Sequence, residues 1–418
     1  MFHHVFRLSQ PDLAVAPLPT ETAGTHSGLR MGNFRHGRAV DWITQAALGA
    51  LMGELMMGKR LGNRALAWGA LFGMMPELLE VLVSPLLDTA RELAWGGGIG
   101  HSLVVMALGS WGIAQGLAKL WKREKITKPQ AGAFVFAVWW AHVLVDCFAV
   151  EGAALLWPVV EKRVAFNFLY HLDFLFSGPL VVAVLWLAIL REPVAKKTRA
   201  RKNAPPSKRR KLCHLGLALS AAVALLAVAM KFVASAGFDA DLARRRTQYE
   251  RRMESPTPFN FLLWRSVVDR GSEFWVGYRS VFERHESPVR WTVYLKGTET
   301  LTPVSTLREA KTLTSISDGW WIARPHAKGA WLGDMRFPEA RTWGSKKGMV
   351  DSRLAFSWVI DATAERDHLR QFSPDDESTS DYLQRMAART FGNRETWEAI
   401  PRLAGVKGSL PESLPVEE

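Results

Sequence analysis

The amino-acid sequence predicts an α-helical integral membrane bundle of five or six segments, followed by a small, mainly β extramembrane domain with a C-terminal helix. Two observations favour this fold class. Apolar runs of membrane length fill the chain up to about residue 236, whereas residues 237–418 are mixed and polar. Much of the formal net charge of +13 lies in short loops between the apolar runs, where it orients a membrane protein and does not indicate nucleic-acid binding.

The first part of the chain is predicted to be a disordered tail over residues 1–40. It has no continuous apolar stretch followed by a small-residue cleavage site, so a signal peptide is not predicted. Pro, Thr, Ser and Gly are frequent in its second half, and Met31 is an alternative start to Met1. We therefore expect three regions: the tail at 1–40, a membrane domain at 41–236 and an extramembrane domain at 237–418.

The apolar segments determine the predicted topology. They are residues 43–58, 65–83, 99–121, 131–150, 168–190 and 213–236. The first segment is short and contains Glu54, which indicates a tilted or partly inserted helix. Lys and Arg are concentrated in every second loop, and by the positive-inside rule these loops are cytoplasmic. This places residues 237–418 on the non-cytoplasmic side of a bacterial cytoplasmic (inner) membrane.

The polar C-terminal part is predicted to form a small antiparallel sheet with a helix before it and a helix after it. A polar amphipathic stretch at 239–254 predicts a helix, and a last helix is predicted at 378–399. Between them, short runs rich in Trp, Tyr, Val and Phe alternate with turn residues. These predicted strands are residues 274–282, 289–295, 319–323, 331–337 and 354–360. The two cysteines, Cys147 and Cys213, lie in apolar segments, so no disulfide framework is predicted.

The fourth apolar segment carries the first candidate site, His142 and Asp146. Ionisable side chains inside a membrane segment are costly and usually functional. At a spacing of i and i+4, the two side chains project from one helix face and can share a divalent cation. The alternative is a His–Asp pair that satisfies itself at a helix–helix contact.

Other acids and histidines fall at the same predicted depth. They are Asp41 before the first segment, Glu77 and Glu80 in the second, His101 at the start of the third and Asp173 at the start of the fifth. Their convergence on one membrane face is what a metal site between helices requires. Each also has a structural alternative: Asp41 fits an N-cap, and Glu77 and Glu80 can simply lie near the interface.

Taken together, these residues resemble the YdjM-like membrane-bound metal-dependent hydrolases. The resemblance rests on residues 41–73, Pro76–Glu77, His101–Ser102, the His-x-x-x-Asp of His142–Asp146, and residues 166–179, 257–265, 274–282 and 333–337. It implies a metal-dependent hydrolase, and a distant likeness to zinc-dependent phospholipase C and P1-type nucleases implies phosphoester chemistry. The chain departs from the family pattern at two places. Glu80 stands one residue beyond the second acid of Pro-Asp-x-Asp, and Gly96 and Gly97 replace a His-Arg pair.

The leading hypothesis is an integral membrane hydrolase with a divalent metal, zinc or alternatively manganese. The expected ligands are Asp41, Glu77, His101, His142, Asp146 and Asp173, with Glu80 as the acid that accepts a proton. The site is expected to open at the outer membrane face, which suggests a lipid-like substrate. The lipid bilayer is the expected partner, and no nucleic-acid partner is expected. A catalytically degenerate scaffold or binding protein of the same fold is the alternative. A transporter ranks third, because the acids lie on one face only and leave no path across.

Overall fold

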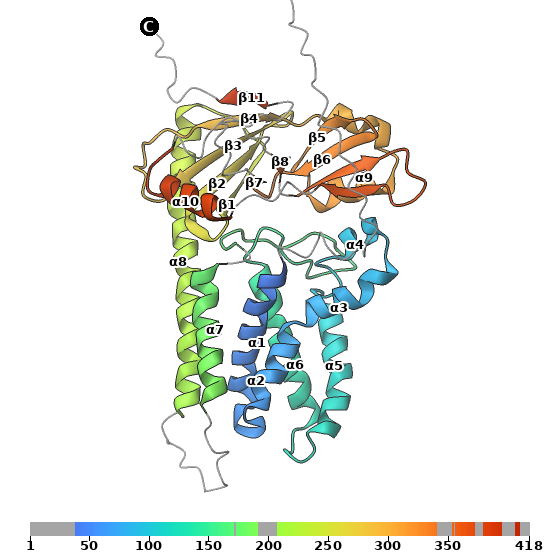
Figure 1. Cartoon of the computed structure of the whole chain (residues 1–418), viewed down its shortest axis with the longest axis vertical. Helices are drawn as coiled ribbons and strands as arrows, with labels where there is room; N and C mark the ends of the chain where they lie inside the picture. The colour runs from blue at the N-terminus through green and yellow to red at the C-terminus, as the bar shows by residue number, and fades with distance from the viewer. Residues whose placement is uncertain are drawn as a thin grey trace, which may run out of the picture.

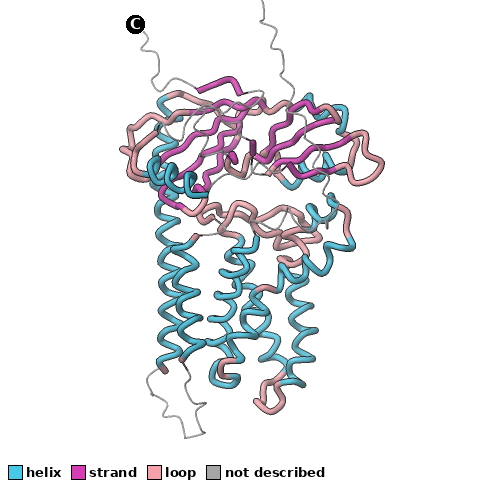
Figure 2. The backbone as a smooth tube through the Cα atoms, viewed as in Figure 1, coloured by secondary structure: helices cyan, strands magenta, loops and turns pink. Residues whose placement is uncertain are grey.

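The chain folds into a helical bundle with a β-rich domain on one end (Figure 1). The computed structural model describes residues 38–170, 173–190, 207–340, 353–354, 356–372, 379–394 and 406–409. The predicted tail up to residue 37 and most of the basic loop 191–212 lie outside the described residues. Figure 2 shows a layer of loops between the bundle and the strands, and one long helix that runs past this layer and ends beside the strands.

The described helical part contains both long and short helices. Their bounds are α1 (Arg38–Leu61), α2 (Arg64–Gly73), α3 (Met75–Val83), the 3-10 helix η1 (Ser84–Leu86), α4 (Thr89–Trp95), α5 (Leu103–Leu120), α6 (Lys128–Asp146), α7 (Phe174–Ile189) and α8 (Lys208–Arg244). Helices α3 and α4 lie at the sheet-side end, close to the layer of loops (Figure 1).

Only some of these helices meet the length and composition expected of a membrane span. Among the described residues, α5 and α8 do so, and α2 together with Met75–Leu86 makes a third span if this pair is counted as one. Helix α7 is apolar but shorter. The membrane character of the helical part is therefore supported, while the count of five or six spans is not confirmed.

The predicted second segment, residues 65–83, is broken into α2 and α3. The two helices meet at Met74 with a bend of 52°. Pro76 lies in the first turn of α3, where its missing N–H costs no helical hydrogen bond. The bend turns α3 and its acidic residues across the sheet-side end of the bundle.

Glycines bring α1 and α2 into close contact. A Cβ atom on Gly49 would lie 2.3 Å from the carbonyl oxygen of Gly69, and one on Gly53 would lie 2.2 Å from that of Ala65. Such small residues let two backbones approach closely in a membrane bundle. The same contact fixes Gly73, whose backbone carbonyl contributes to the site described below.

Helix α1 accommodates Glu54 through a buried ion pair. Arg209 of α8 donates from Nε to Glu54 Oε1 at 2.9 Å and from Nη2 to Oε2 at 2.8 Å. The same guanidinium donates to the carbonyl oxygen of Leu187 in α7 at 2.7 Å. The acid that suggested a partly inserted segment thus joins α1, α7 and α8 inside the bundle.

The β-rich domain holds two small antiparallel sheets and a C-terminal helix. The five-stranded sheet has the order β1-β2-β3-β4-β11, the four-stranded sheet the order β10-β9-β6-β5, and β7 pairs with β8. The bounds are β1 (Arg251–Thr257), β2 (Asn260–Asp269), β3 (Glu273–Ser280), β4 (Trp291–Leu295), η2 (Thr298–Val304), α9 (Arg308–Ile316), β5 (Trp321–His326), β6 (Gly329–Asp334), β7 (Glu339–Ala340), β8 (Arg353–Leu354), β9 (Ser357–Asp361), β10 (Leu369–Phe372), α10 (Thr379–Thr390) and β11 (Val406–Ser409).

Strand β2 shows why this domain is mixed in sequence but well packed. Its side chains alternate, so Trp264 and Val268 pack in the cluster that contains Phe238 of α8. Leu263 and Val267 pack instead in the cluster shared with the other sheet. Both faces of the strand are therefore buried.

Two boundaries predicted in this region are wrong. The polar stretch 239–254 is not one helix, because α8 ends at Arg244 and Arg251 already starts β1, which pairs along β2. The described part of the last helix, α10, ends at Thr390 and not at residue 399. Five of the strands, β3, β4, β5, β6 and β9, lie where runs of aromatic and β-branched residues predicted them.

Helix α8 continues without a break past residue 236, where the extramembrane domain was predicted to begin. Its last turns are bound to the five-stranded sheet through Asp241. Trp291 Nε1 donates to Asp241 Oδ2 at 2.8 Å, and the backbone N–H of Val289 donates to Oδ1 at 3.2 Å. One helix therefore connects the bundle to the domain.

Candidate metal centre

Three potential metal ligands meet at the sheet-side end of the bundle. Asp146 Oδ2 lies 2.6 Å from His101 Nε2 and 2.9 Å from His142 Nε2. One ligand atom from each of the three residues lies within 4.8 Å of the other two. This spacing lets one ion contact all three. The three residues form a possible metal-binding site, as their predicted depth had indicated.

The backbone determines which nitrogen of His142 carries a proton. His142 Nδ1 lies 2.5 Å from the carbonyl oxygen of Gly73, and a carbonyl oxygen can only accept, so Nδ1 is the donor. In the neutral imidazole, Nε2 then presents a lone pair. That lone pair faces Asp146 Oδ2 at 2.9 Å and Glu77 Oε1 at 3.2 Å. Three electron-rich atoms oppose one another here, and a cation between them, either a metal ion or a proton, is needed to hold the arrangement.

Local structure explains how the two histidines come together. His142 and Asp146 lie one turn apart on α6, and the contact at 2.9 Å confirms that their side chains share a face. His101 precedes Ser102, the N-cap of α5. Trp139 of α6 donates from Nε1 to the carbonyl oxygen of Gly100 at 2.8 Å, which holds the turn carrying His101 against α6.

The two acids of α3 border the cluster from one side. Glu77 contacts His142 as described, and its side chain is 12% exposed. Glu80 Oε1 accepts a hydrogen bond from the backbone N–H of Gly97 at 2.7 Å and lies 4.0 Å from His101 Nδ1. Glu77 is therefore placed beside the His142–Asp146 contact, and Glu80 beside the other ring.

The remaining two predicted ligands lie elsewhere or are not described. Asp173 caps α7: its Oδ1 accepts from the backbone N–H groups of Leu175 at 2.9 Å and Phe176 at 3.1 Å. It does not join the group of ligand atoms found among the described residues. Asp41 lies in the first turn of α1, and its side chain is outside the described residues.

Sequence reasoning missed Gln45 of α1. This side chain is 0% exposed, and its Nε2 donates to Asp146 Oδ1 at 2.7 Å. The bond leaves Asp146 Oδ2 directed at the two histidines. A lone amide in an apolar segment is a usable signal, because such a group is buried only with a partner.

The residues present fit a divalent ion of the zinc type. Two imidazoles and a carboxylate are a donor set of catalytic zinc sites, and the supporting bonds from Gly73 and Gln45 are of the kind that orient metal ligands. His142 Nε2, His101 Nδ1 and Glu77 Oε2 are buried in the described structure without a hydrogen-bond partner. An ion held by this set would satisfy atoms that are otherwise costly to bury.

Comparison with known proteins identifies the helical part. Residues 40–238 match the family model described as YdjM inner membrane protein. The match supports a YdjM-like family assignment for these residues. The match includes α2 to α7 and most of α1 and α8, whereas the β-rich domain lies beyond it. Searches of curated proteins and of solved structures returned no significant match.

The departure from the YdjM-like pattern at Gly96 and Gly97 has a structural counterpart. Bare glycines predict a gap here, but the guanidinium of Arg163 fills it. Arg163 Nη2 donates to the carbonyl oxygen of Gly96, and a Cβ atom on Gly97 would lie 2.9 Å from Arg163 Nη1. The guanidinium of Arg163, from the loop after α6, therefore lies against the backbone of Gly96 and Gly97.

Proposed function

We propose that this chain is an integral membrane, metal-dependent hydrolase acting on a phosphoester of a lipid-like substrate at the non-cytoplasmic face. The observation that carries the proposal is the position of His142 Nε2, 2.9 Å from Asp146 Oδ2 and 3.2 Å from Glu77 Oε1. His101, His142 and Asp146 would hold the ion, with Glu77 as a further ligand. Zinc suits this nitrogen and oxygen set best, and manganese is the alternative.

The chain's own residues would divide the work between them. A divalent ion bound here lowers the pKa of a bound water and polarises the scissile group. Gly73 and Gln45 keep His142 and Asp146 in their orientations. Glu80, held by the N–H of Gly97 at 2.7 Å, is the acid proposed to accept a proton from water.

The surroundings of the cluster support a membrane-derived substrate. Helix α3 turns Glu77 toward the cluster, while Leu82, two residues after Glu80, is 71% exposed. Leu86 of η1 is 80% exposed. A helix with acidic residues on one side and exposed leucine side chains on another suits the membrane interface, where the acids meet polar groups and the leucines meet acyl chains. A lipid could then approach the centre from the bilayer.

The test is the metal content of the purified full-length chain, measured by elemental analysis together with hydrolysis of short-chain phospholipids. We expect near-stoichiometric zinc or manganese that is lost in His142→Ala and retained in His214→Ala, a change on the exposed surface of α8. Metal and turnover lost together in His142→Ala support the hydrolase. Absence of metal from both the wild-type chain and the control would favour the scaffold alternative and end the proposal.

A further inference from the structure

A cavity of about 400 Å³ lies between the loop after α6 and the β-rich domain. Its walls include Trp157 and Asn167 of the loop and Met253 and Trp320 of the domain. The volume is within the range of small-molecule sites. Nothing in the proposed mechanism uses this space.

Backbone bonds hold the loop side of the cavity in shape. The N–H of Phe166 donates to the carbonyl oxygen of Cys147 at 2.7 Å, and Ala153 and Val164 exchange hydrogen bonds at 3.1 and 2.9 Å. Val150 packs in the same apolar cluster as Met253 of the domain. The cavity is therefore built into the joint between the two parts of the chain.

The cavity is lined by an equal number of acids and bases. They are Glu151, Glu161 and Asp318, and Lys162, Arg163 and Arg336. Asp334 pairs with Arg336 at 2.7 Å. Burial alone would lower the pKa of the Arg336 guanidinium, but Asp334, Glu151 and Asp318 raise it above its ordinary value. The lining thus offers sites for both signs of charge within one space.

The loop wall offers both hydrogen-bond acceptors and hydrogen-bond donors. Glu151 is half-buried, and Asn167 presents a buried Oδ1 that has no hydrogen-bond partner among the described residues. Both are acceptors, so they suit an N–H-rich cation. Arg163 lines the same cavity and supplies N–H donors, which suit a phosphate.

We propose that this cavity binds a zwitterionic phosphoethanolamine headgroup, with its phosphate at Arg163 and its ammonium group at Glu151 and Asn167. A purely anionic ligand would oppose the three acids, and a purely cationic one the three bases. A zwitterion satisfies both sets, and Trp157 adds an aromatic side chain to the cavity wall that suits an ammonium group.

The cavity and the metal centre are connected through two adjacent residues, Gly96 and Gly97. Arg163 binds the carbonyl oxygen of Gly96, and the N–H of the next residue, Gly97, binds Glu80 beside His101. A headgroup bound at Arg163 is therefore held next to the proposed hydrolytic centre. The inference rests on the proposed function only for this role as a substrate site, whereas binding itself can be measured without turnover.

The headgroup is assigned to a lipid because of the apolar residues on either side of Trp157 in the loop. Val159 is 85% exposed, Leu156 56% and Val160 42%. These apolar side chains continue from the cavity wall to the surface and suit acyl chains. A water-soluble ligand with the same headgroup would gain nothing from them.

The experiment is a calorimetric titration of the full-length His142→Ala chain in detergent, which binds without turnover. Dihexanoyl phosphatidylethanolamine is compared with dihexanoyl phosphatidylglycerol, which lacks the ammonium group, and with glycerophosphoethanolamine, which lacks acyl chains. We expect the first to bind about tenfold more tightly than either of the others, the usual effect of losing one charge-assisted contact or a comparable apolar one.

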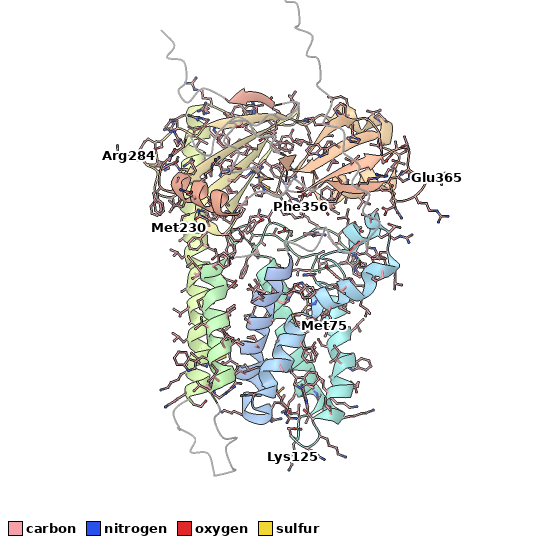
Figure 3. All side chains as sticks on the ribbon, viewed as in Figure 1. Met75, Lys125, Met230, Arg284, Phe356 and Glu365 are labelled. Atoms are coloured by element: carbon pink, nitrogen blue, oxygen red, sulfur yellow. The ribbon has the colours of Figure 1, made fainter. Side chains whose placement is uncertain are left out.

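Two further variants assign the ends of the headgroup. Glu151→Gln keeps the size of the side chain and should weaken phosphatidylethanolamine about tenfold while leaving phosphatidylglycerol unchanged. Arg163→Gln should weaken both lipids, and Arg284→Gln, on the far rim of the β-rich domain, should change neither (Figure 3). Because Glu151→Gln changes only the charge of the side chain and not its size, it keeps the test valid if Arg163→Gln does not fold.

The outcomes separate this inference from the proposed function. Equal binding of the two lipids, or a Glu151→Gln variant that retains the preference, would overturn the zwitterion assignment. Equal binding of glycerophosphoethanolamine would overturn the lipid source. Headgroup-selective binding by the His142→Ala chain, together with a wild-type chain that contains no metal and hydrolyses nothing, would support the inference and refute the hydrolase.

Discussion

The contact between Gln45 and Asp146 gives the sharpest prediction about the metal centre. Replacing Gln45 by Leu removes a 2.7 Å hydrogen bond to a carboxylate from a side chain that is 0% exposed. A hydrogen bond to a charged group is worth about 1.5–3 kcal/mol. Loss of such a supporting partner typically weakens metal affinity about 10–100-fold, which is about 1.4–2.7 kcal/mol, so the two magnitudes agree.

The assay is competition for zinc between the purified variant and chelators of graded affinity. Thr44→Val is the matched control, because Thr44 is the preceding residue of α1 and is equally buried. Its hydroxyl pairs with Ser177 at 2.7 Å and not with the cluster. We expect Gln45→Leu to lose affinity within the stated range and Thr44→Val to lose little. If both variants bind zinc like the wild type, Asp146 does not act as a ligand and the reasoning fails.

Three other predictions concern the frame around the site. Replacing Glu54 by Gln should destabilise the chain in detergent by about 3–5 kcal/mol, because Arg209 is left buried without its acid. The double variant Glu54→Leu with Arg209→Met should be close to neutral in stability. Equal losses of stability in the single and double variants would contradict this prediction. Burial opposes ionisation of Asp88, but the N–H of Arg91 and the guanidinium of Arg308 lower the pKa of its carboxyl group below the ordinary value. The ionised carboxylate should therefore stabilise the fold at pH values above the ordinary pKa, and this stabilisation should be lost as the pH falls through the lowered pKa. Thermal unfolding of Asp88→Asn should accordingly approach that of the wild type at acid pH, and a difference that grows on acidification would contradict the assignment. A reporter active only in the periplasm, fused after Glu418, should be active, and activity only of a cytoplasmic reporter would invert the topology.

The site residues that sequence predicted well are those set by short-range geometry. His142 and Asp146 follow from their helical spacing, and the depth of His101 follows from its place at the start of an apolar run. Asp173 also lies at the start of an apolar run, but its own backbone uses the carboxylate as a cap. Depth alone does not distinguish a cap from a ligand.

What sequence could not supply are contacts between elements far apart in the chain. Gln45 lies 101 residues from Asp146, and Arg163 lies 67 residues from Gly96. Neither pair has a local pattern, because only the packing of the helices and the loop brings them together. Strand β1 was missed for a related reason, since its charged residues gain their strand character from pairing along β2.

The unbroken course of α8 has a mechanical consequence. A helix of 37 residues is about 55 Å long, whereas the hydrocarbon core of a bilayer is about 30 Å thick. Helix α8 is therefore long enough to cross the bilayer and to continue into the β-rich domain as one rigid helix. Near its C-terminal end, Asp241 accepts the hydrogen bonds from Val289 and Trp291 that attach the helix to the five-stranded sheet. A domain mounted in this way follows the tilt of its helix, and the tilt follows the thickness of the surrounding bilayer. We therefore expect the spacing across the joint to respond to lipid chain length.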